Sequence, residues 1–481
     1  MNRIFNNKIQ FQRSFLFRIC GVILFSVLFS LNSCAVREPY STPPNIVDEN
    51  LFRTPQLPED SLGMAHISYT EIFNDSILLQ HISNALAQNL DVRIAGQNIL
   101  VAEAYLKQAR AAYQPTLNLA TNYTFVTQSL NTQFGRIIGE RRYIHQFDIT
   151  SQISWEADIW GKLKAQEQAQ LAQFLSTFAG HQTVKADLVT SLASLYFQLL
   201  ALDEQKRILE ETIDIRTQNV ETTQLLKDAG ILTEVAVQQS DALVYNAKAM
   251  LVEVEGRIFT LENAFCVLLA IPSQPVSRTT LNEQTVNISL ETGYPLELLS
   301  NRPDIIQAEN ELRQAYALTT VARANFYPMF RINGTIALQS IELDDLLSIN
   351  SFFANVASGF LQPILARRQI RSEYEASLAR QEMALLNFRK SILNAGREVS
   401  DAMKIYQLQD EFIALKLQEL EAYERSVEYS QELLNYGMAN YLEVLNANVS
   451  MLSAELSVSN ARLARLQAAV DLYRALGGGW R

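Results

Sequence analysis

The sequence contains little glycine and little proline. Only 17 Gly and 12 Pro occur in 481 residues, whereas Ala, Leu, Gln and Glu are abundant. Because glycine and proline disfavour helix interiors, this composition predicts long helices. The stretch from Leu163 to Asp228 has one glycine, Gly180, and no proline. It predicts a nearly continuous helix of about 65 residues, roughly 100 Å long.

Patterns of catalytic residues are also missing. The histidines at positions 66, 81, 145 and 181 are scattered, and none has a zinc-binding spacing. We find no nucleophile elbow, phosphate loop or dinucleotide fingerprint, and the run Gly477-Gly478-Gly479 lacks the lysine and the following helix of a phosphate loop. These absences predict a protein that is not an enzyme and that uses no metal or other cofactor.

Basic tracts are absent too. The chain has 40 Lys and Arg against 51 Asp and Glu, a formal net charge of −11, which argues against nucleic acid as a partner. No Pro/Gly/Ser-rich linker separates the two halves of the chain. We therefore expect both halves to build one body.

The N-terminus predicts export from the cytoplasm. Four basic residues precede an apolar run from Ile19 to Leu31, which is too short to span a bilayer comfortably and fits a secretory leader at 1–33. The run ends at Cys34 in a segment that resembles a bacterial lipobox, although Asn32 departs from the small residue usual there. Acylation of Cys34 is the prediction, and an ordinary signal peptide followed by an incidental cysteine is the alternative.

The residues after Cys34 predict an outer-membrane destination. Ala35 provides no acidic retention signal for the inner membrane, and five prolines between positions 35 and 60 predict an extended tether. Several acyl groups on Cys34 would hold the chain in outer-membrane lipid. Cys266 lies in an apolar helical run and is predicted to be a small core residue.

The chain is a tandem duplication. Residues 89–123 and 302–336 match at a constant offset of 213 positions, and a second match at an offset of 207 positions pairs Gly230 with Gly437. A repeat of this length far exceeds that of solenoids and indicates pseudo-symmetry about one axis. The predicted parts are a leader at 1–33, a tether at 34–73, a first repeat at 74–270, an equatorial linker at 271–297, a second repeat at 298–476 and a flexible tail at 477–481.

Two kinds of periodicity alternate within each repeat. Apolar spacings of three and four residues from Val92 to Tyr113, and again from Ile305 to Phe326, follow the 3.5-residue period of coiled coils. After Pro115 and Pro328 the period changes to two, which indicates strands. The predicted strands are about 115–126 and 143–158 in the first repeat and about 328–339 and 352–363 in the second.

These strands resemble the strands of transmembrane β-barrels. Each has about ten residues with one apolar and one polar face. Four strands cannot close a barrel, and lipid offers no partner to an open sheet edge, so copies of the chain must complete the pore. The predicted class is an α+β membrane protein, and a soluble α+β protein with a surface sheet is the alternative.

Several motifs identify a family resemblance. The junction Ala-Arg-Ala-x-x-x-Pro occurs twice, and the segments at 155–162 and 301–305 add Trp-Glu-Ala-Asp-Ile-Trp-Gly-Lys and Asn-Arg-Pro-Asp-Ile. Together with the Cys-x-x-x-x-Pro-Tyr-x-x-Pro tether from Cys34 to Pro43, they resemble the TolC/OprM-type outer-membrane efflux channels across essentially the whole mature chain. The resemblance implies a homotrimer with a twelve-stranded barrel in the membrane and a twelve-helix tunnel in the periplasm.

The same resemblance implies partners and functional residues. The turns at 227–233 and 435–440 would contact a periplasmic adaptor protein. The implied contact residues are Lys227, Ala229, Gly230, Ile231, Leu232, Tyr436, Gly437, Met438 and Ala439. Glu443 and Asn446 occupy positions where the family often places acidic residues that narrow the tunnel mouth, and a solvated surface role for Glu443 is the alternative.

The implied function is passive conduction of small molecules to the cell exterior. An inner-membrane pump, for which the resemblance favours a proton-driven type, would supply the energy. A duct for type I protein secretion and a non-conducting coiled-coil lipoprotein scaffold are the alternatives. Drug, metal and protein cargo all stay open, because a wide water-filled tunnel selects weakly.

Overall fold

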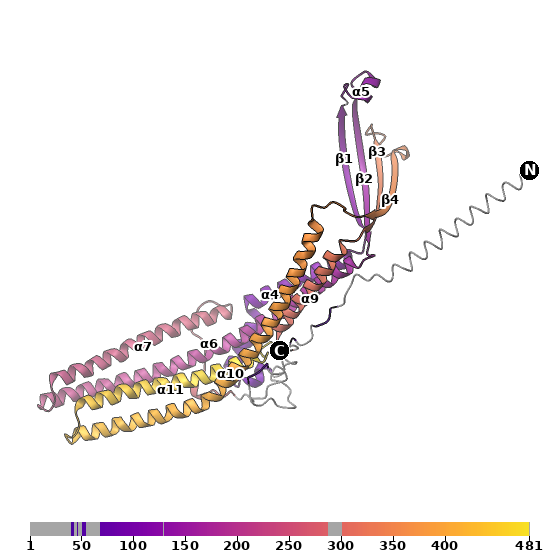
Figure 1. The fold of residues 1–481 in the computed structure, drawn as a ribbon. Coiled ribbons are helices and arrows are strands. Elements are labelled where there is room, and N and C mark those ends of the chain that lie inside the picture. Colours follow the sequence, from indigo (N-terminus) through magenta and orange to yellow (C-terminus); the bar gives the residue numbers. More distant parts are fainter. Residues whose placement is uncertain are drawn as a thin grey trace, which may run out of the picture. The chain divides into compact units, whose positions relative to one another are not determined.

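The computed structural model describes residues 40–42, 46, 51–53, 68–127, 129–286 and 301–480 (Figure 1). The leader and Cys34 lie outside this part, as do residues 287–300, which include the end of the predicted linker and the first residues of the predicted second repeat. The helices are α2 (Tyr69–Ile72), α3 (Ser76–Gln88), α4 (Leu90–Ala111), α5 (Gln133–Ile138), α6 (Lys162–Asp228), α7 (Glu234–Leu268), α9 (Pro303–Ala324), α10 (Gln369–Asn435) and α11 (Tyr441–Ala475), with short 3-10 turns η3 (Leu281–Glu283) and η4 (Ile349–Ser351). The strands are β1 (Thr116–Thr127), β2 (Tyr143–Ala157), β3 (Met329–Ser340) and β4 (Phe352–Leu361).

The helix lengths confirm the duplication. Helices α4 and α9 both have 22 residues, α6 and α10 both have 67, and α7 and α11 both have 35. The prediction of one continuous helix from Leu163 to Asp228 is therefore correct to within a residue. Among the described residues, no helix is both long enough and apolar enough to cross a bilayer.

The chain divides into two compact units, and each takes segments from both repeats. The first unit contains the described part of Met1–Thr42 together with Ala102–Phe174 and Glu311–Leu385. The second contains the described parts of Pro43–Val101, Leu175–Asn310 and Leu386–Arg481. The two repeats seen in the sequence are thus folded together within each unit.

One four-stranded antiparallel sheet, in the order β1-β2-β3-β4, forms in the first unit. Each repeat contributes one hairpin, in which Thr116 pairs with Ser154 and Met329 pairs with Leu361. The hairpins join through β2 and β3, where Phe147 pairs with Ser340. Strands β1 and β4 are left as the two edges, and every residue of both is exposed in the single chain.

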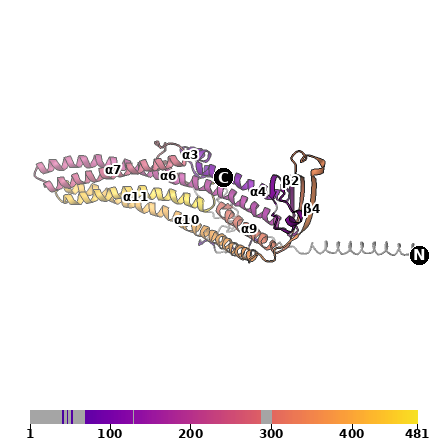
Figure 2. The same ribbon diagram turned by 90° about the horizontal axis from the view of Figure 1, so that it is seen from above.

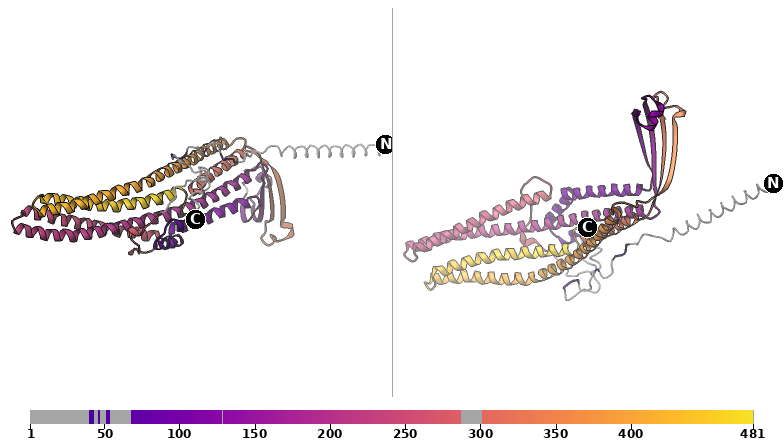
Figure 3. Two further views of the ribbon diagram at one scale, coloured as in Figure 1. Left: turned by 90° about the horizontal axis from the view of Figure 1, so that it is seen from below. Right: turned by 45° about the horizontal axis from the view of Figure 1, so that its top comes forward.

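Two pairs of long helices dominate the second unit. Helix α7 runs beside α6, and α11 runs beside α10, in every view (Figures 2 and 3). Leu202 and Leu209 of α6, Val254 of α7 and Leu452 of α11 belong to one buried cluster. Helix α11 therefore contacts more than one neighbour.

Aromatic side chains of α6, α7 and α11 pack around Phe73 in the core of the second unit. Phe73, which directly follows α2, packs against Phe197 at 6.2 Å and edge-on against Tyr473 at 6.3 Å between ring centroids. Tyr196 and Phe265 lie beside them, 6.5 Å apart and fully buried. Edge-to-face contacts of this kind add stability beyond the burial of apolar area.

The C-terminal tail is packed, so the prediction of a flexible segment at 477–481 is wrong for the residues that the structure describes. Residues 477–479 are buried, and a Cβ atom on Gly478 would lie 2.2 Å from the ring of Tyr473. Trp480 donates a hydrogen bond from Nε1 to the carbonyl oxygen of Asn301 at 3.2 Å. The glycines therefore serve close packing in this segment.

Candidate functional site: two helical turns and the aperture positions

The turns that follow α6 and α10 have the same backbone geometry. Gly230 and Gly437 both adopt the left-handed conformation, with φ of 77° and 70°. In the first turn the Gly230 and Ile231 amides donate to the carbonyls of Lys227 and Leu226, at 2.8 and 2.9 Å. The second turn repeats these bonds 207 positions later, at 2.9 and 2.8 Å. Both are Schellman caps, which satisfy the last carbonyls of a helix and reverse the chain.

The side chains of the two turns are mostly exposed and apolar. Ile231 is 67% exposed, Tyr436 is 71% exposed and Met438 is 77% exposed. Leu232 and Ala439 are half-buried, and Ala229 is exposed. Among the nine predicted contact residues the only charged side chain is Lys227, whose Nζ lies 2.7 Å from Glu234 at the start of α7.

Hydrogen bonds hold the two turns close together. The hydroxyl of Tyr441, the first residue of α11, lies 3.0 Å from Oγ1 of Thr223 near the end of α6. The same hydroxyl also bonds Ser240 of α7. This three-residue link fixes the start of α11 against the first helical pair, so the two turns form the same end of the second unit.

The two predicted aperture residues lie on one exposed face. Glu443 and Asn446 are exposed in the first two turns of α11, three residues apart, and the intervening Val444 is buried. The backbone amide of Glu443 bonds the carbonyl of the cap residue Asn440 at 2.9 Å. In the part of the chain that the structure describes, the Glu443 carboxylate has no ion pair.

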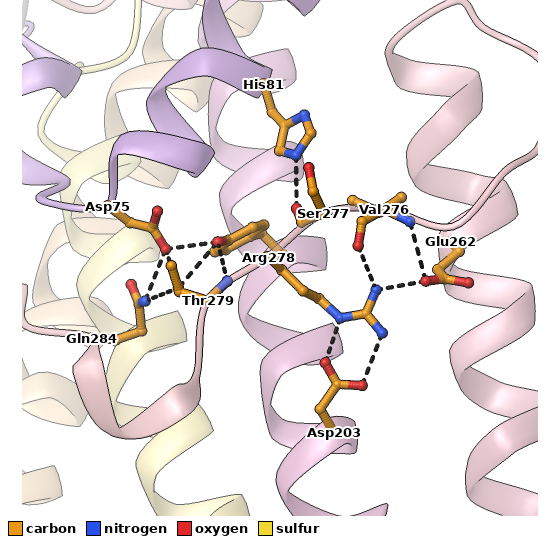
Figure 4. A network of polar contacts seen from close by, with 10 residues as sticks. Asp75, His81, Asp203, Glu262, Val276, Ser277, Arg278, Thr279 and Gln284 are labelled. Atoms are coloured by element: carbon orange, nitrogen blue, oxygen red, sulfur yellow. Dashed lines mark hydrogen bonds and ion pairs between the residues drawn. The ribbon is translucent and has the colours of Figure 1, made fainter.

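A polar network that the sequence did not predict joins α3 to the segment after α7 (Figure 4). Asp75 accepts hydrogen bonds from Tyr196, at 2.7 Å, from Gln284, at 2.9 Å, and from Thr279. It also caps α3 through the Ile77 amide at 2.8 Å. Burial opposes ionisation of this carboxyl, but the hydrogen bonds outweigh it and hold the pKa of Asp75 below its usual value.

Arg278 extends this network to the long helices (Figure 4). Its guanidinium bonds Asp203 of α6, with Nη2 to Oδ1 at 2.8 Å, and Glu262 of α7 at 2.6 Å. The hydrogen bond to Asp203 is the largest contribution that raises the pKa of Arg278. The segment after α7, which belongs to the predicted equatorial linker, is therefore clamped to both helices.

Arg302 of the Asn-Arg-Pro-Asp motif forms a second clamp. Burial alone would lower its pKa, but Asp304 at 2.7 Å and Glu398 at 2.8 Å raise it. Its Nη1 also donates to the carbonyl oxygen of Ala475, at the end of α11, at 2.9 Å. The motif thus connects the start of α9 to α10 through Glu398 and to the end of α11 through the Ala475 carbonyl.

No group of three or more His, Cys, Asp or Glu side chains that can hold a metal ion is present among the described residues. Cys266 is buried, and its thiol donates to the Gln274 carbonyl at 3.4 Å. The histidine of the network, His81, lies 3.0 Å from the Ser277 carbonyl through Nε2. These groups have packing partners, and their geometry provides neither a metal centre nor a nucleophile with a base.

A duplicated chain with one four-stranded sheet and two long helical pairs has the architecture of an outer-membrane channel of the efflux type. The chain belongs to the outer membrane efflux protein family, whose model matches residues 81–269 and 295–478. This membership places the chain in the outer membrane and confirms the family resemblance seen in the motifs.

Similar proteins of this family differ in what their names say they export. The chain is 25% identical over 468 residues to the cation efflux system protein CusC of Escherichia coli O6:H1, covering 96% of this chain and 99% of CusC. It is 28% identical over 427 residues to the solvent efflux pump outer membrane protein SrpC of Pseudomonas putida, covering 87% of this chain and 89% of SrpC.

A solved structure shares the fold. The MtrE outer membrane channel of Neisseria gonorrhoeae, crystallised in its open state, superposes with a TM-score of 0.81 at 23% identity and covers 93% of this chain and 99% of MtrE. The predicted fold class, with long helices and four strands contributed by each chain, is confirmed.

Proposed function

We propose that three copies of the chain form the outer-membrane duct of a tripartite efflux system. The duct conducts small molecules passively from an inner-membrane pump and a periplasmic adaptor to the cell exterior. The observation that carries this proposal is the sheet: β1 and β4 are edges with every residue exposed. Lipid cannot satisfy the backbone groups of an open edge, so β1 of one copy pairs with β4 of the next.

The two helical turns form the adaptor contact in this proposal. They lie at the same end of the second unit and present Ile231, Tyr436 and Met438 to solvent. Exposed apolar side chains around a rigid turn suit docking against the helical hairpin of a partner. The same end carries Glu443, so three copies place a ring of carboxylates at the periplasmic mouth, where it attracts cations.

The lipobox supplies the anchor. Acylation of Cys34 attaches the chain to the inner leaflet of the outer membrane. Incorporation of labelled palmitate into the wild-type chain, and its loss in Cys34→Ser, is the expected result. Equal labelling of both forms would reject this site.

Small-molecule efflux is favoured over protein secretion by the two relatives, whose names give cations and solvents. We propose a proton-driven pump, the type that the family resemblance favours. We propose no enzymatic activity and no cofactor, because the family that the chain belongs to consists of outer membrane efflux proteins.

Conductance and drug sensitivity test the function together. We expect the purified protein to give discrete single-channel steps in planar bilayers, and deletion of the gene to raise sensitivity to several toxic compounds. A protein that inserts stably but never conducts would support the scaffold alternative. Loss of a secreted protein without any change in sensitivity would support the secretion alternative.

A further inference from the structure

A cavity of about 240 Å³ lies among α6, α7, α10 and α11 next to the two turns. Polar side chains of α6, α7 and α11 form part of its lining. Among them are Arg216, Asn219, Thr223, Ser240, Tyr441 and Asn448. No carboxylate lines the cavity among the described residues, so Arg216 is its only charged group at neutral pH.

Arg216 is buried without an acidic partner. It is 5% exposed, and the one hydrogen bond of its side chain in the described structure runs from Nη1 to the carbonyl oxygen of Leu243 at 2.7 Å. The remaining guanidinium N–H groups have no protein acceptor there. A buried cation without a counter-charge is strongly unfavourable, and a guanidinium stays protonated at physiological pH.

Two other arginines of the second unit, the partly buried Arg278 and the buried Arg302, show what is missing at Arg216. Arg278 has Asp203 and Glu262, and Arg302 has Asp304 and Glu398. In both cases the acids raise the arginine pKa, whereas burial alone lowers the pKa of Arg216. The acidic side chains that neutralise Arg278 and Arg302 have no counterpart beside Arg216 among the described residues.

Neutral donors complete the lining. The Tyr441 hydroxyl bonds Thr223 and Ser240, so this hydroxyl cluster already connects α6, α7 and α11. The side-chain amide of Asn219 lies one helical turn from Arg216 on α6 and also lines the cavity. The hydroxyls of Thr223 and Ser240 donate to the backbone carbonyls of Asn219 and Ala236, so the Asn219 amide is the neutral donor beside the guanidinium. A guanidinium with an amide donor beside it can bind an oxyanion through several hydrogen bonds.

We propose that this cavity binds a small inorganic oxyanion of the phosphate or sulfate type on Arg216. The ion supplies the missing negative charge and accepts hydrogen bonds from the guanidinium. Bound there, it bridges α6 to α11 and stabilises the association of the two helical pairs next to the turns. This site goes beyond the proposed transport function, because it depends on neither cargo nor conduction.

Thermal unfolding of the purified full mature protein tests the site. Inorganic phosphate should raise the midpoint in a saturable way relative to sodium chloride of equal ionic strength, since a ligand of the native state stabilises it. Arg216→Gln should weaken phosphate binding by at least about tenfold. The matched control is Arg207→Gln, which removes an exposed arginine of α6 paired with Glu204 and Glu211 and should leave the phosphate response unchanged.

Two outcomes would overturn the proposal in this assay. One is an equal shift with phosphate and with chloride, and the other is a phosphate response that survives in Arg216→Gln. If the variant fails to fold, the wild-type protein decides the matter through crystals soaked in arsenate, a phosphate analogue with an anomalous signal. An anomalous peak beside the Arg216 guanidinium supports the site, and a cavity that contains only water at saturating arsenate rejects it.

Discussion

Gly230 and Gly437 are equivalent residues that end two 67-residue helices with the same pair of cap hydrogen bonds. Both have a positive φ, and no heavy atom lies within 4 Å of the position that a Cβ would take. The constraint on these two residues is therefore the backbone conformation alone. Steric crowding plays no part.

Alanine at either turn should loosen it. Gly230→Ala and Gly437→Ala each force a left-handed alanine, which costs about 1 kcal/mol. We expect faster hydrogen exchange of the turn amides and weaker adaptor binding. Gly256→Ala is the control, because this glycine lies inside α7 with open space around it, and alanine there should stabilise the helix by up to about 1 kcal/mol. Turn amides that exchange as slowly in both turn variants as in the wild type would contradict this account.

Removal of Arg302 should destabilise the second unit. Arg302→Ala leaves the Asp304 and Glu398 carboxylates and the Ala475 carbonyl without their donor. The expected loss is about 2–3 kcal/mol, below the full cost of a broken buried pair because both carboxylates are partly exposed. Arg425→Ala, which removes an exposed partner of Glu421 on α10, should change stability by no more than about 0.5 kcal/mol. Equal melting shifts in the two variants would show that the clamp is not needed.

Asp75 should make stability depend on pH in acid. Burial alone would raise the pKa of Asp75. The hydrogen bonds from Thr279, Tyr196 and Gln284 together lower it by more than burial raises it, so the folded pKa lies below the unfolded value. The stabilisation is then fully present above the unfolded pKa, near 3.8, and is lost as the pH falls through the folded pKa.

Unfolding curves between pH 6 and pH 2 measure this effect, and Asp75→Asn should flatten the acid limb. Tyr196→Phe, which removes one donor to Asp75, should give an intermediate profile. An acid limb in Asp75→Asn that is as steep as in the wild type would contradict the assignment.

Charge changes at the aperture positions should act in opposite directions. Glu443→Gln removes the proposed ring of carboxylates and should lower the preference for cations in bilayer recordings, whereas Asn446→Asp should raise it. Both effects should be larger at about 0.01 M than at about 0.1 M salt, because the Debye length falls from about 30 Å to about 10 Å. If neither variant alters ion selectivity, Glu443 is a solvated surface residue.

Much of the fold follows from patterns that are local in the sequence. The scarcity of glycine and proline predicts α6 to within a residue, and the change of period after Pro115 and Pro328 predicts where β1 and β3 begin. The glycines of the turns are also visible, because Gly230 and Gly437 are matched by the repeat. These features depend on neighbours a few residues apart.

The clamps were missed because their partners are far apart in the sequence. Arg302 and Ala475 are 173 positions apart, and Asp75 and Tyr196 are 121 positions apart. No period or motif marks such pairs before the helices are placed. The tail was misjudged for a related reason: a run of glycines is typical of flexible segments, but Gly478 is needed where the backbone packs against the Tyr473 ring.

Disulfide cross-linking between the two sheet edges tests the central claim most directly. Thr121→Cys in β1 is combined in turn with cysteines at positions 353–359 of β4. Within one chain these edges lie about 14 Å apart, across three strand spacings, which is too far for a disulfide. For some cysteine pairs we expect covalent dimers and trimers, with no larger product. The single-cysteine variants should give no covalent dimer or trimer. Monomer at every position of the scan would contradict it.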